Sequence, residues 1–239
     1  MPFVFEPGTS WMYGPGADWT GKLIERVTGE TLETYMAKNI WNPLGMKDVT
    51  FFPDARADMT DRLADLSSLD PSGGRSVPVP EEWDVNAGCK ECMGGGGASA
   101  STDTFMLLLR AVLREDPKLL ATSGWEEFFK PQLDEQCARA LHKLLLNDPS
   151  MQDYCGMDVP TSGKKNWSFG GLLSQDDYPG LMSDSTLLWG GLPCLRWFVD
   201  RKAGICGFSG AQMLPPMAPP IMKLHENFQR EIFALSALA

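Results

Sequence analysis

The most constraining feature of this sequence lies near its N-terminus, where a loop rich in turn residues precedes two amphipathic segments. Residues 5–16 read Phe-Glu-Pro-Gly-Thr-Ser-Trp-Met-Tyr-Gly-Pro-Gly, and such a density of proline and glycine is typical of a loop. Apolar residues then recur at the spacing of one helical face: Trp19, Leu23, Ile24 and Val27. We expect a helix here with that face inward, with Asp18 as its N-cap and Gly29 as its stop.

Further helices are indicated along the chain. Thr31 is a good N-cap for a second helix, and Pro43 is expected to end it, because proline disfavours helical geometry at the preceding residue. Ser101 is the expected N-cap of a helix whose inward residues are Phe105, Leu108, Leu109, Val112 and Leu113. Residues 135–146 suggest another helix. The terminal helix is expected to bury Ile221, Leu224, Phe228, Ile232 and Leu235.

Short strands are predicted towards the C-terminus, at 185–189, 195–200 and 203–208. Residues 53–98 are rich in Pro, Gly, Ser and Asp, and are expected to form a long irregular crossing. Helices followed by antiparallel strands and a covering helix indicate an α+β fold. We expect one domain, with a mainly helical lobe over 1–165 and the strands and last helix over 166–239.

Charge and hydropathy disfavour two classes of partner. The formal net charge is −10, and binding nucleic acid requires clustered Lys and Arg. No window approaches the ~20 apolar residues of a membrane span, and the first residues lack the pattern of a signal peptide. The sequence therefore predicts neither a nucleic-acid nor a membrane partner, and a cytoplasmic location.

The cysteines do not form a metal or redox motif. All six are dispersed, and free, mostly buried thiols are expected. Cys89 and Cys92 form a CxxC, but glycines follow it and no second ligand pair exists for zinc. The glycines at 94–97 lack the Gly-Lys-Ser/Thr of a phosphate-binding loop. We predict neither a metal nor a cofactor.

Residues 5–51 closely resemble the middle of the serine β-lactamase / penicillin-binding-protein-like hydrolases, and within them the fungal esterases and acyltransferases of the lovastatin-acyltransferase type. Residues 94–103 resemble a helix start of the same family. The resemblance implies a β-lactamase/transpeptidase-like fold and a serine hydrolase or transesterase acting on small-molecule esters, thioesters or amides. In that family the N-terminal strands and a helix-borne Ser-x-x-Lys nucleophile precede the tyrosine loop, so we expect this chain to be a fragment without them.

The resemblance assigns the catalytic role to Tyr13, through the surrounding Phe-x-Pro-Gly-Thr-x-Trp-x-Tyr. The family's tyrosine moves a proton to and from the leaving group, and a nearby lysine cation lowers its pKa. The family's usual motif is Tyr-x-Asn, and here its third position is Pro15. The asparagine side-chain amide that orients substrate in the family is therefore replaced by proline. A packed loop tyrosine is the alternative.

A second family element is an edge strand beside the nucleophile, matched here by Trp189, Gly190, Gly191 and Leu192. Glycines allow a ligand to approach the backbone closely. By resemblance, the N–H of Leu192 donates to an oxyanion and Trp189 forms an apolar pocket wall. A core tryptophan followed by a turn is the alternative.

The sequence offers one Ser-x-x-Lys, from Ser162 to Lys165, and it lies in a loop after the tyrosine. The active motif needs a helix to bring both side chains to one face. His142 and His225 are expected at the surface or at helix ends. Two hypotheses stay open: an acyl-transfer lineage whose chain is inactive alone, or a non-enzymatic protein that binds a ligand or a partner protein. An unpaired strand edge also predicts self-association.

Overall fold

The computed structural model describes residues 3–70, 72, 75–79, 86 and 88–236. Its largest sheet is antiparallel, with the strand order β5-β6-β7-β8-β9. The strands are β5 (Lys165–Ser168), β6 (Gly171–Ser174), β7 (Leu187–Gly191), β8 (Leu195–Asp200) and β9 (Ile205–Gly210). The predicted strands are confirmed as β7, β8 and β9 with ends shifted by a few residues, whereas β5 and β6 were not predicted.

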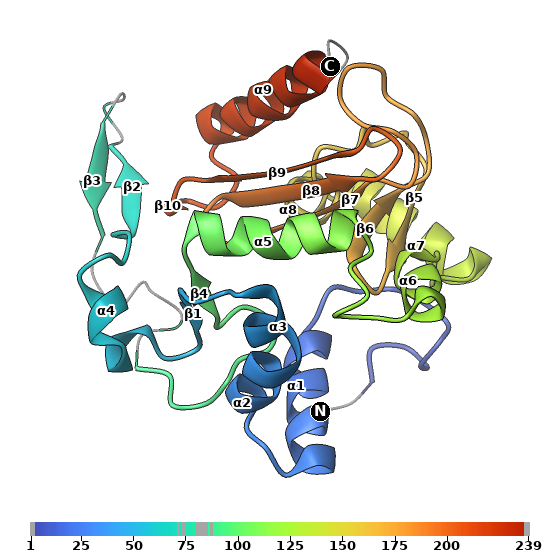
Figure 1. Cartoon of the computed structure of the whole chain (residues 1–239). Coiled ribbons are helices and arrows are strands. Elements are labelled where there is room, and N and C mark those ends of the chain that lie inside the picture. The colour runs from blue at the N-terminus through green and yellow to red at the C-terminus, as the bar shows by residue number, and fades with distance from the viewer. Residues whose placement is uncertain (1–2, 71, 73–74, 80–85, 87, 237–239) are drawn as a thin grey trace.

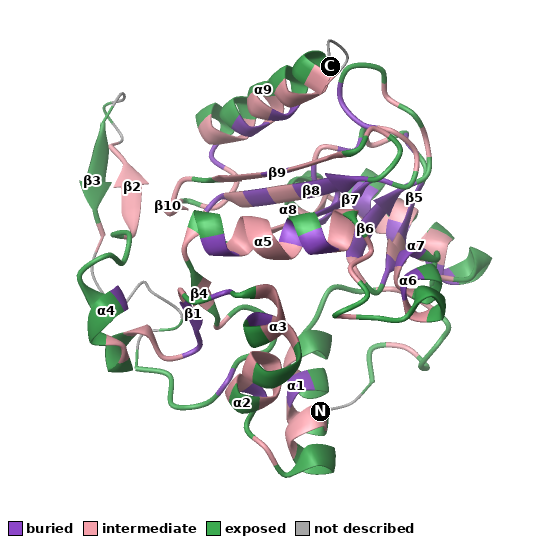
Figure 2. Ribbon diagram, in the orientation of Figure 1, coloured by how far each residue is buried: buried purple, intermediate pink, exposed green. Residues whose placement is uncertain are grey.

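Two helices cover the two faces of this sheet, α5 (Thr102–Leu113) on one side and α9 (Pro219–Ser236) on the other (Figure 1). On the α9 side, Leu188 and Phe198 pack against Phe228 and other residues of the helix. On the α5 side, Leu109 packs in one cluster with Leu187 and other sheet residues. The buried residues of the sheet therefore lie between two helical layers (Figure 2), and the α+β expectation is confirmed.

Helix α9 does not bury the stripe that its sequence predicts. Leu224 and Leu235 are 57% and 62% exposed, while His225 and Gln229 are only 2% and 3% exposed. The helix is rotated because polar groups beneath it need partners: the Gln229 side chain donates to the Leu181 carbonyl at 2.8 Å, and His225 is hydrogen-bonded at both ring nitrogens. Phe228 and Ile232 still face the core as expected.

The N-terminal helices form a separate layer below α5 (Figure 1). They are α1 (Gly16–Thr28), α2 (Leu32–Met36), the π-helical turn η1 (Ala37–Trp41) and α3 (Asn42–Leu44). Thr31 caps α2 as predicted, accepting a hydrogen bond from the Thr34 N–H at 3.2 Å. The helical run passes Pro43 and ends at Gly45, whose φ of 70° is left-handed.

Two expectations about α1 are wrong. Its N-cap is Pro15, and Asp18 lies inside the helix, where its carboxylate accepts a hydrogen bond from the Gly95 N–H at 2.8 Å. The face expected to be buried is largely exposed, with Trp19 at 71% and Val27 at 76%. The helix is instead held through Gly21 and Ile24, because the glycine-rich segment after Cys92 comes so close that a Cβ on Gly94 would lie 2.6 Å from the Ala17 carbonyl.

The remaining elements are short or surround the sheet. Helices α6 (Thr122–Phe129), α7 (Glu135–Asn147) and α8 (Pro149–Cys155) precede β5. The expected irregular crossing contains η2 (Pro53–Ala55), α4 (Ala57–Thr60), β2 (Ser67–Leu69) and β3 (Ser76–Pro78), and its residues 71, 73–74, 80–85 and 87 lie outside the described part. Strand β2 pairs with β10 (Met213–Leu214), and β1 (Val49–Thr50) with β4 (Ser99–Ala100). None of the helices in the described ranges has the length and apolar character that crossing a bilayer requires.

Candidate active site

Tyr13 and Trp189, far apart in the sequence, lie against each other. Tyr13 is on the loop before α1 and Trp189 is on β7, and their ring centroids are 5.5 Å apart. The Tyr13 side chain is half exposed, at 51%. The two elements that the sequence assigns to one site are therefore neighbours, with a phenol open to solvent beside a strand end.

Aromatic rings connect this pair to the rest of the protein. Trp167 on β5 meets Trp189 edge-on with centroids 4.8 Å apart, and Trp11 meets Trp167 at 5.3 Å. The same loop is held to α7, because the Gln136 side chain donates to the Thr9 carbonyl at 2.8 Å. The loop that carries Tyr13 is thus fixed by ring contacts on one side and by α7 on the other. The sequence did not identify Trp167, whose strand lacks a clear alternating pattern.

The end of β7 presents backbone groups that the sheet does not use. Strand β6 pairs only with Leu187 and Leu188 of β7, so within the described ranges the residues from Trp189 to Gly191 pair with β8 alone. A Cβ on Gly190 would lie 2.1 Å from the Leu195 carbonyl oxygen, which explains why a glycine is needed there. Leu192 follows in the β7–β8 turn and is 43% exposed. Free backbone groups at a strand end can approach a ligand closely.

The groups around Tyr13 act on the pKa of its phenol in one direction. Burial raises the pKa of the Tyr13 phenol, and Cys155 and Asp18 raise it further. Cys155 is itself buried, and burial raises the pKa of its thiol to about 11. The resemblance attributes the lowered pKa of the family's tyrosine to the lysine of the upstream Ser-x-x-Lys, which this chain was expected to lack. At neutral pH the Tyr13 hydroxyl therefore remains protonated and acts as a hydrogen-bond donor.

Ser162 and Lys165 do not form a nucleophile pair. Ser162 lies exposed in a turn before β5. The sequence predicted a loop at this position, so no helix brings Ser162 and Lys165 to one face. Lys165 is 4% exposed, and its ammonium donates to the Pro160 carbonyl at 3.0 Å. Burial lowers the pKa of Lys165 to about 8. The lysine is therefore hydrogen-bonded to the backbone, and no hydrogen bond joins it to Ser162 among the described residues.

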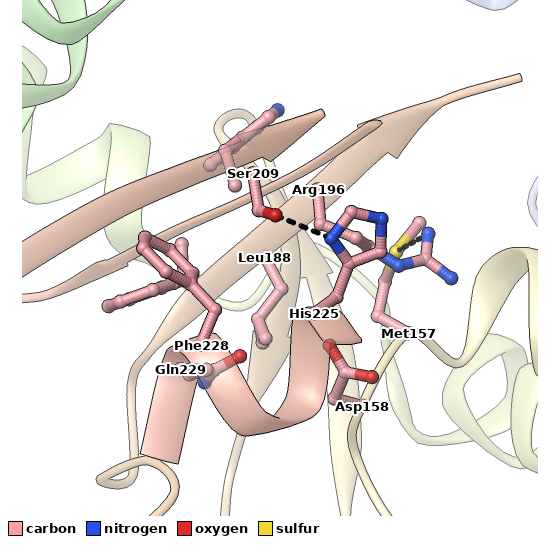
Figure 3. A pocket seen from close by; sticks show the side chains of 10 residues that line it. Met157, Asp158, Leu188, Arg196, Ser209, His225, Phe228 and Gln229 are labelled. Atoms are coloured by element: carbon pink, nitrogen blue, oxygen red, sulfur yellow. Dashed lines mark hydrogen bonds between the residues drawn. The ribbon is translucent and has the colours of Figure 1, made fainter. Parts of the chain in front are cut away.

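A buried polar cluster beneath α9 was missed by sequence reasoning (Figure 3). His225 was expected at the surface or a helix end and is instead buried. Burial is possible because both ring nitrogens have partners: Nε2 lies 2.9 Å from the Cys194 carbonyl oxygen and Nδ1 lies 2.7 Å from the Ser209 hydroxyl. A carbonyl can only accept, so Nε2 carries the proton and Nδ1 accepts from Ser209. The adjoining cavity, about 10 Å³, has room for a single water molecule. Ser209 is therefore a packed serine and not one that can receive an acyl substrate.

Comparison with known proteins places this geometry in one family. The sequence pattern of the Beta-lactamase family matches residues 1–205. Lovastatin esterase from Penicillium rubens is 36% identical over 97% of this chain and 58% of its own length. Monacolin J acid methylbutanoyltransferase from Aspergillus terreus is 32% identical over 98% of this chain and 56% of its own length.

Solved structures agree with the sequence comparison. A variant of simvastatin synthase (LovD) from Aspergillus terreus superposes with a TM-score of 0.91 at 30% identity, covering all of this chain and 58% of the synthase. EstCE1, a hydrolase with promiscuous acyltransferase activity, shares the fold with a TM-score of 0.69 at 20% identity, covering 96% of this chain and 57% of its own. The chain thus spans under three-fifths of the length of these relatives. It belongs to the Beta-lactamase family, in a lineage of esterases and acyltransferases.

Proposed function

We propose that this chain is the tyrosine-bearing part of an enzyme that transfers acyl groups from esters, thioesters or amides. The contact between Tyr13 and Trp189, with ring centroids 5.5 Å apart, carries the proposal. It brings a protonated phenol beside a strand end whose backbone groups are not taken up by β6. A proton donor next to free N–H groups is the combination that acyl transfer uses when a tetrahedral intermediate forms and collapses.

Each residue of the site then has a distinct role. Tyr13 passes a proton to the leaving group, and the N–H of Leu192 donates to the oxyanion. Gly190 and Gly191 allow the acyl carbonyl to approach the strand. Trp189 forms an apolar wall, extended by Trp167 behind it. A small apolar acyl group, such as the methylbutanoyl of the relative's name, fits the chemistry of this wall.

The nucleophile is the part of the mechanism that this sequence does not supply. Ser162 lies in a turn and its lysine is bound to the backbone, while Ser209 faces a cavity of one water. We therefore propose that the chain alone forms no acyl-enzyme. The test is incubation with a fluorophosphonate probe, followed by intact-mass spectrometry. We expect no adduct, and a stoichiometric adduct that maps to Ser162 or Ser209 would overturn the assignment.

One observation favours a second function, a protein that binds an acyl ligand without reacting. The pKa of Tyr13 is raised and not lowered, so the phenol of this chain is a donor and not a base. The aromatic wall from Trp11 to Trp189 is complete without the nucleophile. Titration with lovastatin, followed by tryptophan fluorescence, tests this function. The control variant is Trp19→Ala, because Trp19 is an exposed residue of α1. Saturable quenching that Trp189→Ala loses and Trp19→Ala keeps would support ligand binding, and no quenching would exclude it.

A further inference from the structure

Arg196 on β8 lies directly beneath the candidate site. It is the register partner of Gly190 on β7, and only 7% of it is exposed. Its Nη1 is 3.1 Å from the position that a Cβ on Gly190 would occupy. Because register partners on neighbouring strands point to the same face, the guanidinium lies on the side of the sheet that Gly190 shares with Leu188 and with helix α9. The strand end that carries the proposed acyl site thus has a buried cation next to it.

The charge of this guanidinium is poorly compensated. Within the described ranges no carboxylate lies at ion-pair distance from it. Its Nη2 donates to the Asp153 carbonyl at 3.0 Å, and its other contacts are thioether sulfurs, of Met157 at 2.7 Å, Met217 at 2.9 Å and Met222 at 3.4 Å. Thioethers are weak acceptors, and the Nε of Arg196 has no hydrogen-bond partner. Asp158 and Asp153 attract the guanidinium from beyond ion-pair distance, and among the described residues no direct ion pair neutralises it, so its field also acts on the surrounding backbone.

His225 and Asp158 are titratable groups that line the same cavity as Arg196 (Figure 3). Burial lowers the pKa of His225, and its hydrogen bonds require only the neutral ring. Asp158 also lines the cavity, and burial raises the pKa of its carboxyl although Arg196 opposes this. Glu226 on α9 is paired with Lys223 and Arg230 at the surface. None of these groups forms an ion pair with the guanidinium within the described ranges, so the attraction of Asp158 and Asp153 offsets its positive charge only in part.

We propose that Arg196 is a positioning residue, whose buried charge makes the backbone from Gly190 to Leu192 a subsite for an anionic oxygen. Its ligand class is a short carboxylate, or the oxyanion of an acyl-transfer intermediate. The proposal rests on the proposed function for the location of the subsite. In a low-dielectric interior a nearby positive charge strengthens hydrogen bonds to an anion, and it does so for a charged ligand but not for a neutral one of the same shape.

The test uses the ¹⁵N-labelled chain in low salt, titrated with butyrate and with butyramide, its neutral analogue. We expect butyrate to shift the amide resonances of Gly190, Gly191 and Leu192. Arg196→Met, which places a further thioether among the three present, should weaken butyrate binding on the order of tenfold and leave butyramide binding unchanged. Arg196→Lys should retain most of the butyrate affinity. Arg201→Met, at the other end of β8, is the matched control and should change neither.

The outcomes separate this proposal from the acyl-transfer function. If Arg196→Met weakens the binding of butyrate and of butyramide equally, Arg196 has a merely structural role. Unchanged butyrate binding in Arg196→Met would also refute the proposal, and so would the absence of butyrate binding to the unmodified chain. If Arg196→Met does not fold, Arg196→Gln removes the same charge and meets the same criteria. A failure of acyl transfer in a nucleophile-complete enzyme leaves the butyrate result standing, because carboxylate binding requires no nucleophile.

Discussion

Replacing Gly190 by alanine tests the packing at the end of β7. The new Cβ would lie 2.1 Å from the Leu195 carbonyl oxygen and 3.1 Å from the Arg196 Nη1. The nearer contact involves backbone, and Gly190 is paired in register with Arg196, so relief requires the two strands to separate locally. Overpacking of this kind costs about 1–3 kcal/mol. For a chain of this size that corresponds to a fall in Tm of about 2–12 °C.

The assay is urea denaturation followed by tryptophan fluorescence, with a thermal melt beside it. Gly14→Ala is the matched control, because a Cβ on Gly14 meets no atom within 4 Å and the residue does not need a left-handed φ. We expect Gly190→Ala to unfold at lower urea than the unmodified chain and Gly14→Ala to match or exceed it. Equal midpoints for the two variants would refute the close approach of β8 to Gly190.

Three further predictions concern stability and association. The pKa of Lys165 in the fold, about 8, is below its ordinary 10.5, so only the unfolded chain binds this proton between those values, and the contribution of Lys165 to stability should rise with pH from about 8 to 10.5. Cys155, whose pKa burial raises from 9.0 to about 11, acts in the opposite direction above about pH 9, so the check is the difference in urea midpoint between the unmodified chain and Lys165→Met, which should move in favour of the unmodified chain as the pH rises. The buried Asp200 carboxylate accepts hydrogen bonds from the N–H groups of Ser183 and Ala203 and from the Thr186 hydroxyl. Asp200→Ala should therefore lower the free energy of unfolding by roughly 3–5 kcal/mol in urea melts. The control Asp184→Ala, at the surface, should lower it by under about 1 kcal/mol. Light scattering after size exclusion should show concentration-dependent association through the outer edge of β9, and a monomer at all concentrations would exclude it.

The sequence predicted correctly those helices and strands in which the periodic apolar residues are the residues that face the core. Helix α5 begins with Ser101 as its N-cap, which accepts a hydrogen bond from the Thr104 N–H at 3.3 Å, and Leu109 is buried as its spacing indicates. Strands β7 to β9 were found from apolar and β-branched runs between turn residues. Strands β5 and β6 were missed, because the buried positions of β5 include the polar residues Lys165, Asn166 and Ser168.

The errors arise where polar groups are buried or apolar groups exposed. On α9 the whole apolar stripe was assigned to the core, but Leu224 and Leu235 are exposed. His225 and Gln229 are inside instead, because Ser209 and the carbonyls of Cys194 and Leu181 provide their hydrogen-bond partners. On α1 the spacing of Trp19 and Val27 is helical, yet spacing cannot say what covers a face, and here both are exposed. Arg196 gave no signal, since a lone arginine in a strand is usually read as a surface residue.

The candidate site came from family resemblance and not from composition or periodicity. Nothing in the spacing of residues near Tyr13 predicts a contact with Trp189, which depends on how the first loop meets the end of β7. Burial dominates and raises the pKa of Tyr13, whereas the lysine that the resemblance implies belongs to the Ser-x-x-Lys that this chain was expected to lack. The site residues therefore remain proposals that rest on a geometry the sequence alone could not provide.

The central claim is that Tyr13 serves acyl transfer once a nucleophile is present. The direct measurement is ester hydrolysis by this chain joined to the part of the Penicillium rubens lovastatin esterase that it does not cover. We predict turnover by the joined enzyme that Tyr13→Phe lowers by about 10²–10⁴-fold, while Tyr154→Phe on α8 leaves it unchanged. Full turnover in Tyr13→Phe would contradict the account.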